Sequence, residues 1–248
     1  RELSHGTAMH WELSDGASMH RQVPKHSWCV TRDDLVDFER RVWSVIQLGR
    51  IQPTPEDDFD RSNRRIGPNI YSVTEQFIKP VTREAGMMSW ALMLHPDGLK
   101  CDLFITHAWQ QGVFEFIRKV LHSWPRLTRN AYCCMLANPQ NSDIADLISS
   151  PRESPFALAL MSASHMLVVP NSKQSIYMRL WCAFEASLAY EKNKVIQVAS
   201  APTPRRALCW ACLRVNSAAL CGACAGWLRP GSEDLLCCFV VIMTAIGV

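Results

Sequence analysis

The sequence carries no large excess of charge of either sign. Its 26 Lys and Arg residues nearly balance 23 Asp and Glu residues, which leaves a formal net charge of +3. Proteins that bind nucleic acid or an anionic membrane usually present a broad basic surface. The composition therefore predicts no nucleic-acid partner.

Long apolar runs are scarce as well. The first thirty residues contain no stretch that resembles a secretory signal, so we expect a cytoplasmic protein. The apolar segment LLCCFVVIMTAIGV at residues 235–248 is shorter than the roughly 20 residues that span a bilayer. We expect no membrane anchor. The sequence leaves three interpretations of this segment: a last buried strand, an apolar tail or the start of a membrane helix.

Cysteine, in contrast, is frequent, with eleven residues of this type. Cys101, Cys133, Cys134 and Cys182 lie in segments whose neighbours are apolar. In an intracellular protein such thiols are expected to stay reduced and to pack as small hydrophobes.

The C-terminal segment, residues 201–248, differs from the rest in being rich in cysteine and apolar residues. It holds two Cys-x-x-Cys pairs, the ligand type of a tetrahedral zinc site; the four candidates are Cys209, Cys212, Cys221 and Cys224. The two pairs are closer together than the usual separation of about 15 to 20 residues, and the sequence between them has few polar groups that could support a metal. Zinc ligation and free thiols are the two alternatives, and we favour free thiols.

The N-terminal part of the chain is expected to contain a flexible arm and a helical extension. ELSHGTAMH at residues 2–10 recurs as ELSDGASMH at 12–20, and this polar repeat offers little apolar surface to order residues 1–30. Residues 31–98 read as helices and loops, beginning with Thr31 as the N-cap of an apolar-striped helix. Ser72 and Glu75 have the spacing of a capping box, and Pro80 is expected to break or kink the helix that follows.

Strands and helices alternate from residue 99 to residue 200. The expected strands are LKCDLFITH (99–107), AYCCMLA (131–137), HMLVVP (165–170) and KVIQVAS (194–200), and the expected helices cover 113–124, 154–164 and 177–190. Apolar strands that alternate with helices predict an α/β fold with a mainly parallel sheet covered on both faces.

Ligands of such sheets bind beyond the carboxyl ends of the strands. The residues at that rim are Thr106, His107, Trp109, Asn138 to Asn141, and Asn171, and the helix that carries Trp181 and Glu185 leaves from the same rim. We predict that Thr106, His107, Trp109, Asn171 and Trp181 contact a substrate. His107 is equally compatible with a strand-end histidine bonded to backbone, Trp181 with a packing aromatic, and the asparagines with turn formation.

Glu185 lies in an otherwise apolar helix, YMRLWCAFEASLAY. Its neighbours three and four positions away include no cation, so it has no local ion-pair partner. One interpretation is a carboxylate that reaches solvent or pairs with Arg179 or Lys192. The other is a partly desolvated group with a raised pKa, as catalytic carboxylates often have.

Two stretches resemble Toll/interleukin-1 receptor-like (TIR) domains over about residues 99–200. CDLFITHAW (101–109) is similar to the first box of that family, and residues 154–198 contain its Trp-Cys-x-x-Glu signature as Trp181, Cys182 and Glu185. The resemblance implies a flavodoxin-like sandwich.

The resemblance implies one of two functions. Some TIR members act only by self-association in intracellular signalling, whereas others hydrolyse the nicotinamide–ribose bond of NAD with the glutamate of that signature. By resemblance Glu185 is the catalytic residue, NAD or a related nucleotide is the substrate, and neither a metal nor a cofactor is expected. The alternative is a non-catalytic protein–protein interaction module.

Overall fold

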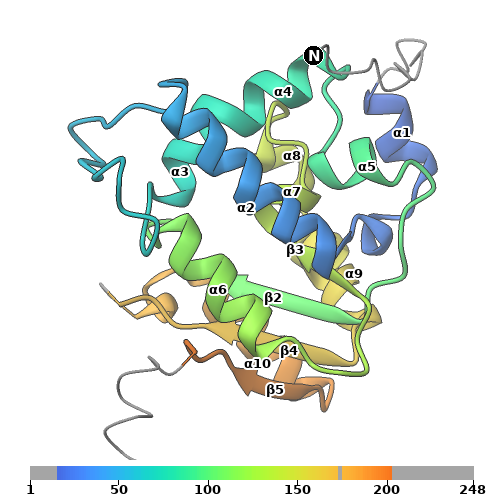
Figure 1. Cartoon of the computed structure of the whole chain (residues 1–248). Coiled ribbons are helices and arrows are strands. Elements are labelled where there is room, and N and C mark those ends of the chain that lie inside the picture. Colours follow the sequence, from blue (N-terminus) through green and yellow to red (C-terminus); the bar gives the residue numbers. More distant parts are fainter. Residues whose placement is uncertain (1–15, 173–174, 203–248) are drawn as a thin grey trace, which may run out of the picture. The chain divides into compact units, whose positions relative to one another are not determined.

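A five-stranded sheet forms the centre of the computed structural model, which describes residues 16–172 and 175–202 (Figure 1). The strands are β1 (Val30–Thr31), β2 (Leu103–His107), β3 (Asn130–Cys133), β4 (His165–Val169) and β5 (Val195–Val198). Their order is β1-β3-β2-β4-β5, with β1 antiparallel to β3 and all other pairs parallel. The predicted α/β class with a mainly parallel sheet is therefore confirmed.

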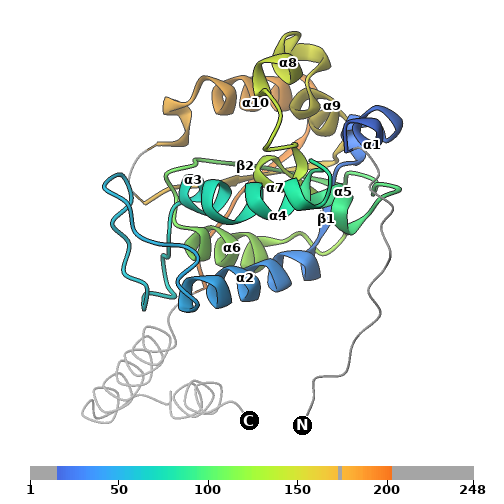
Figure 2. The same cartoon turned by 90° about the horizontal axis from the view of Figure 1, so that it is seen from above.

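Helices cover the sheet on both sides. Figure 2 shows α2 (Arg32–Gln47) and α6 (Val113–Ser123) on one side, and α8 (Ile144–Ile148), α9 (Pro155–Ser162) and α10 (Leu180–Glu191) on the other. The remaining helical elements are α1 (Gly16–Gln22), η1 (Lys25–Ser27), α3 (Ile70–Val73), η2 (Thr74–Ile78), α4 (Lys79–Glu84), α5 (Trp90–Leu94), α7 (Cys134–Ala137), η3 (Pro151–Glu153) and η4 (Ile176–Met178).

The central strands supply side chains to two separate hydrophobic clusters. Leu103 and Ile105 of β2 pack into the cluster that contains α2 and α6, whereas Phe104 between them packs into the cluster that contains α9. Successive side chains of a strand point to opposite faces, so one apolar strand contributes to both cores. Each such side chain contributes about 1.5–3 kcal/mol when it is fully buried.

Two helix starts agree with the sequence. The Thr31 hydroxyl accepts a hydrogen bond from the Asp34 amide at 3.1 Å, while the Asp34 carboxylate accepts one from the Thr31 amide at 2.7 Å, which closes a capping box at the start of α2. Ser154 caps α9 by accepting a hydrogen bond from the Ala157 amide, with Pro155 in the first turn, where a missing N–H leaves no bond unmade.

The capping box predicted at Ser72 is wrong. Asn69 is the N-cap of α3, and its side-chain oxygen accepts from the Ser72 amide at 2.8 Å. The helix continues through the π-helical turn η2 directly into α4, which contains Pro80. Pro80 does not end the helix, because the wider π turn just before it changes the hydrogen-bond pattern that a proline would otherwise disrupt.

The second predicted strand is shorter than expected. Only Asn130–Cys133 pairs in the sheet, and Cys134–Ala137 turns into α7. An apolar run cannot by itself distinguish a buried strand from a buried helix. Met135, Leu136 and Ala137 are good helix formers, which favours the turn that the structure adopts.

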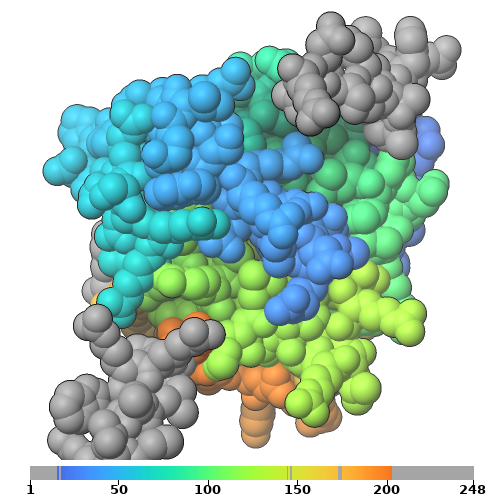
Figure 3. Space-filling model, viewed as in Figure 1, coloured from blue at the N-terminus to red at the C-terminus, as the bar shows by residue number. Residues whose placement is uncertain are grey.

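Residues 16–30, expected to belong to a flexible arm, pack against the rest of the fold. They form α1, η1 and the first residue of β1, and they bury Trp28, which is 1% exposed. The Trp28 indole nitrogen donates to the Val23 carbonyl at 3.1 Å. In Figure 3 the blue surface around α2, which follows this segment, adjoins the green surface of later elements. Residues 16–172 and 175–201 belong to one compact unit.

The last strand differs from the prediction of a sheet covered throughout. All four residues of β5 are exposed within the described part of the chain. The four candidate zinc ligands lie outside the described residues. No helix in residues 16–172 and 175–202 is long and apolar enough to cross a bilayer.

Candidate functional site

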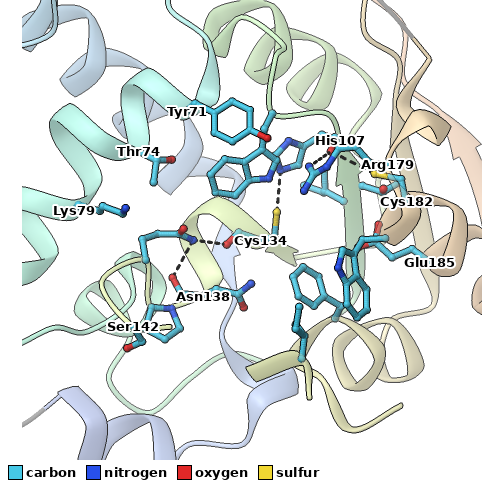
Figure 4. Close-up of a pocket in the computed structure, with 18 of the residues that line it drawn as sticks. Tyr71, Thr74, Lys79, His107, Cys134, Asn138, Ser142, Arg179, Cys182 and Glu185 are labelled. Carbon is cyan, nitrogen blue, oxygen red and sulfur yellow. Dashed lines mark hydrogen bonds between the residues drawn. The ribbon is translucent and has the colours of Figure 1, made fainter. Parts of the chain in front are cut away.

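A cavity of about 470 Å³ lies at the carboxyl ends of the central strands (Figure 4). Figure 4 shows Tyr71, Thr74 and Lys79 on one side of it, and Cys182 and Glu185 of α10 on the other. This volume is within the range of about 300–1,000 Å³ that is typical of small-molecule sites.

Five of the six residues predicted as catalytic or substrate-binding line this cavity; they are Thr106, His107, Trp109, Trp181 and Glu185. The sixth, Asn171, lines a different hollow together with Val168, Ile176 and Val198. Its assignment to the same site is therefore corrected, because Asn171 does not line the cavity that holds Glu185.

Glu185 is 5% exposed and makes no ion pair with any residue in the described part of the chain. Burial raises its pKa from 4.5 to about 7, an effect that the nearby Thr106 hydroxyl and the Arg179 guanidinium partly offset. Of the two cations considered from the sequence, Lys192 pairs instead with Glu191 at 2.8 Å. The carboxyl group can thus change its ionisation near neutral pH, as acid–base and charge-stabilising groups in active sites do.

Arg179 connects the start of α10 to the end of β2. Its Nη1 donates to the His107 carbonyl at 3.3 Å, and the Cys182 thiol donates to the same carbonyl at 3.6 Å. The Arg179 guanidinium also lies 5.8 Å from the centre of the Trp109 ring, within the range of a cation–π interaction. These contacts hold Glu185 beside the end of β2.

His107 is buried and neutral. Desolvation and the nearby Arg179 charge lower its pKa to about 3. Its Nε2 lies 3.3 Å from the Cys134 sulfur, and desolvation followed by the charge of Glu185 raises the pKa of Cys134 to about 12. The lowered pKa of His107 and the raised pKa of Cys134 disfavour the thiolate–imidazolium pair that an activated Cys–His nucleophile uses.

Two pairs of aromatic rings line the cavity. Tyr71 and Trp109 lie 5.1 Å apart between ring centres, and Phe156 stacks on Trp181 at 5.6 Å with an interplanar angle of 18°. Flat ligand rings pack favourably against such side chains. The site therefore offers two aromatic surfaces with a buried carboxylate in the same cavity.

Several buried polar groups at this cavity lack protein partners. Within residues 16–172 and 175–202, no hydrogen bond of normal geometry reaches the hydroxyls of Thr74 and Thr106, Nδ1 of His107 or Nε1 of Trp109. A buried polar group left unpaired costs about 1–3 kcal/mol. These four atoms are buried in the wall of the cavity, and the Thr106 hydroxyl lies close enough to Glu185 to oppose the rise in the pKa of that carboxyl.

The sequence did not predict the side of the cavity formed by the N-terminal helices. Tyr71, Thr74, Glu75 and Lys79 come from α3, η2 and α4, in the segment interpreted as a separate extension. Asn141 attaches this wall to the sheet, because its amide nitrogen donates to the Lys79 carbonyl at 3.0 Å. Periodicity in the sequence does not predict such a contact, since the contact joins residues 62 positions apart.

No metal site is evident in the described residues. Among them, no group of three or more His, Cys, Asp or Glu side chains is arranged to hold a metal ion. The buried cysteines Cys29, Cys101, Cys133 and Cys182 are free thiols, and so is Cys134, as predicted for the cysteines of the apolar segments.

No protein-family model, curated protein or solved structure matches this chain.

Proposed function

We propose that this chain hydrolyses the nicotinamide–ribose bond of NAD, with Glu185 as the central carboxylate. The single observation that carries the proposal is the burial of Glu185 beside a cavity without a cation in ion-pair contact in the described part of the chain. A desolvated carboxylate of this kind stabilises a positive centre strongly, because little solvent screens the interaction.

The sheet supports a flavodoxin-like, TIR-like fold as part of the same proposal. Taken along the chain, the four parallel strands β2, β3, β4 and β5 lie in the spatial order second, first, third, fourth, which is the order of flavodoxin-like sheets. The short antiparallel β1 adds to one edge. Glu185 lies on the helix between the third and fourth parallel strands, as the resemblance implies.

In the proposed reaction, the bond between ribose C1′ and the pyridinium nitrogen breaks, and its electron pair leaves with nicotinamide. The ionised Glu185 carboxylate stabilises the positive ribosyl centre. Water then attacks C1′ and releases a proton, so that NAD and water give nicotinamide, ADP-ribose and H⁺. The aromatic pairs at Trp109 and Trp181 provide surfaces for the two flat rings of the dinucleotide.

The test is to incubate the purified chain with NAD and to measure free nicotinamide by chromatography. We expect turnover in the unmodified protein and a loss of at least about 100-fold in Glu185→Gln, since charge-stabilising groups contribute this much to catalysis. Glu191→Gln is the matched control, because Glu191 lies at the exposed end of the same helix. Turnover that persists in Glu185→Gln would show that the assignment of Glu185 is wrong.

A second candidate function, interaction through self-association, is favoured by an apolar surface next to the site. Tyr177, Met178 and Leu180 on η4 and the start of α10 are 52%, 78% and 84% exposed. We propose a second copy of this chain as the partner. Sedimentation velocity over a range of concentrations should then reveal oligomers that Met178→Glu weakens, whereas a monomer at every concentration excludes this candidate.

A further inference from the structure

Asn138 has a buried side-chain amide that takes no part in the proposed hydrolysis of NAD. It follows α7 and is 2% exposed. Its backbone is held on both sides, since its N–H donates to the Cys134 carbonyl at 3.1 Å and its carbonyl accepts from Gln140 Nε2 at 3.2 Å. The side chain lines the same cavity as Glu185.

Tyr132 fixes the orientation of that amide. The Tyr132 hydroxyl donates to Asn138 Oδ1 at 2.5 Å, a distance that fits an O–H···O hydrogen bond better than an N–H···O bond. Burial raises the pKa of Tyr132 well above 10, so the hydroxyl keeps its proton. The ring is fully buried, stacks on Phe104 at 5.5 Å and contacts the edge of Phe156 at 6.2 Å, which leaves it little freedom to move.

The consequence is that Asn138 presents donors to the cavity. Its oxygen is occupied by Tyr132, and no residue in the described part of the chain accepts a hydrogen bond from its Nδ2. Figure 4 shows Asn138 near Cys134, with Glu185 across from it. Phe156 and Trp181, which stack on each other, line the same cavity.

We propose that Asn138, Phe156 and Trp181 form a subsite for a flat heteroaromatic ring that carries a carbonyl group. The ring packs against the aromatic pair, and its carbonyl oxygen accepts a hydrogen bond from Asn138 Nδ2. Tyr132 does not touch the ligand and is a positioning residue, because it determines which end of the amide faces the cavity. This inference rests on the proposed function for the identity of the ligand, the carboxamide of the departing nicotinamide.

The test measures ring binding and does not require turnover. Nicotinamide and pyridine are titrated separately into the full chain and followed by saturation-transfer NMR. Pyridine retains the ring but lacks the carbonyl group, so the ratio of the two dissociation constants reports the hydrogen bond to the carbonyl. We expect the unmodified chain to prefer nicotinamide about ten-fold, the value of one hydrogen bond of ordinary strength.

Two variants test the residues separately. Asn138→Leu should remove the preference for nicotinamide while pyridine binding stays the same, and Tyr132→Phe should reduce the preference while leaving the ring stack in place. Tyr190→Phe is the control, since Tyr190 is 82% exposed. A thermal melt confirms that each variant is folded, and because Tyr132→Phe removes only one hydroxyl, it keeps the proposal testable if Asn138→Leu does not fold.

An unchanged preference in both variants, or no binding of either ring by the unmodified chain, overturns the subsite. The outcome is distinct from that of the proposed function. A preference for nicotinamide that depends on Asn138, without any cleavage of NAD, supports the subsite and removes the hydrolase. Cleavage of NAD without that preference supports the hydrolase and removes the subsite.

Discussion

The Arg179 guanidinium donates a hydrogen bond to the backbone carbonyl of His107 at 3.3 Å. This contact joins residues 72 positions apart and ties the N-cap residue of α10 to the end of β2. It places a positive charge close enough to Glu185 to oppose the rise of its pKa, and the same charge lowers the pKa of His107. One cation therefore affects the ionisation of both Glu185 and His107.

Replacing Arg179 with Met should raise the pKa of Glu185 further above its ordinary value, because the charge that favours the carboxylate is lost. The pKa can be followed by ¹³C NMR of the Glu185 carboxyl carbon, with Glu185→Gln used to assign the signal. Arg40→Met is the matched control, since the Arg40 side chain is exposed on α2. An unchanged Glu185 titration in Arg179→Met would contradict the proposed influence of Arg179.

The proposed NAD hydrolysis should increase with pH and level off above about 7. Only the ionised Glu185 can stabilise the ribosyl cation, and its pKa is raised to about 7 by burial. The measurement is kcat/KM for NAD between pH 5 and pH 9, which reports the groups that titrate in the free protein. A rate that is flat through pH 7, or that falls across it, would be inconsistent with an ionised Glu185 as the active form.

The free energy of unfolding should fall as pH rises, whereas the rate of NAD hydrolysis should rise, and both changes come from the ionisation of Glu185. Its folded-state pKa, about 7, is above the unfolded value of 4.5, so the native state binds more protons and its stability falls as pH rises from about 4.5 through 7. The free energy of unfolding of Glu185→Gln lacks this dependence on pH. Relative to the unmodified chain, it should therefore increase by on the order of 3 kcal/mol from pH 4 to pH 8, at about 1.4 kcal/mol per unit of pKa shift.

Urea unfolding of both proteins at pH 4 and pH 8 measures this difference. Comparing the change between the two pH values cancels any effect of the substitution that does not depend on pH. Glu191→Gln serves again as the control. A hydrogen bond and the charge of Lys192 lower the pKa of the solvent-exposed Glu191, so this substitution should not increase the relative stability as pH rises. Equal pH dependence in Glu185→Gln and the unmodified chain would refute the buried, titrating carboxyl group.

Trp28 should be essential for stability although it lies in a segment that was expected to be flexible. Its side chain is 1% exposed, and removing a buried aromatic typically costs about 3–5 kcal/mol. Trp28→Ala should show this loss in urea unfolding, whereas Leu127→Ala, at a position that is 91% exposed, should change stability by about 0.5 kcal/mol or less. Equal effects of the two substitutions would indicate that residues 16–30 do not stabilise the fold.

The start of α3 can be tested by a pair of alanine substitutions. Asn69→Ala removes the side-chain oxygen that caps the helix and should destabilise the protein by about 1 kcal/mol. Ser72→Ala should have a smaller effect, since Ser72 lies inside the helix and not at its cap. A larger loss in Ser72→Ala would restore the capping box predicted from the sequence.

Much of the local structure could be predicted because it depends on neighbours in the chain. Thr31 caps α2 through Asp34, three residues later, and Ser154 with Pro155 begins α9. The local predictions were wrong where the same residues allow two local structures. Asn69 caps α3 in place of Ser72, and the apolar run after Cys133 forms a helical turn where a strand was expected.

The candidate site was predictable in part for a topological reason. Thr106, His107 and Trp109 follow β2, and the ends of parallel strands meet at one edge of a sheet, so their presence at the cavity follows from the strand pattern. Asn171 obeys the same rule but lines another hollow, since the rule gives the edge of the sheet and not the path of the loop.

By itself, the sequence determined the α/β class, several helix starts and the single carboxylate within residues 177–190, because these depend on periodicity and on residues within one or two turns. Only the tertiary structure decided that Glu185 is buried beside a cavity, that Tyr71, Thr74 and Lys79 form its opposite wall, and that Tyr132 orients Asn138. Desolvation and the direction of a buried amide arise from side chains that are distant in sequence, and no local pattern encodes such contacts.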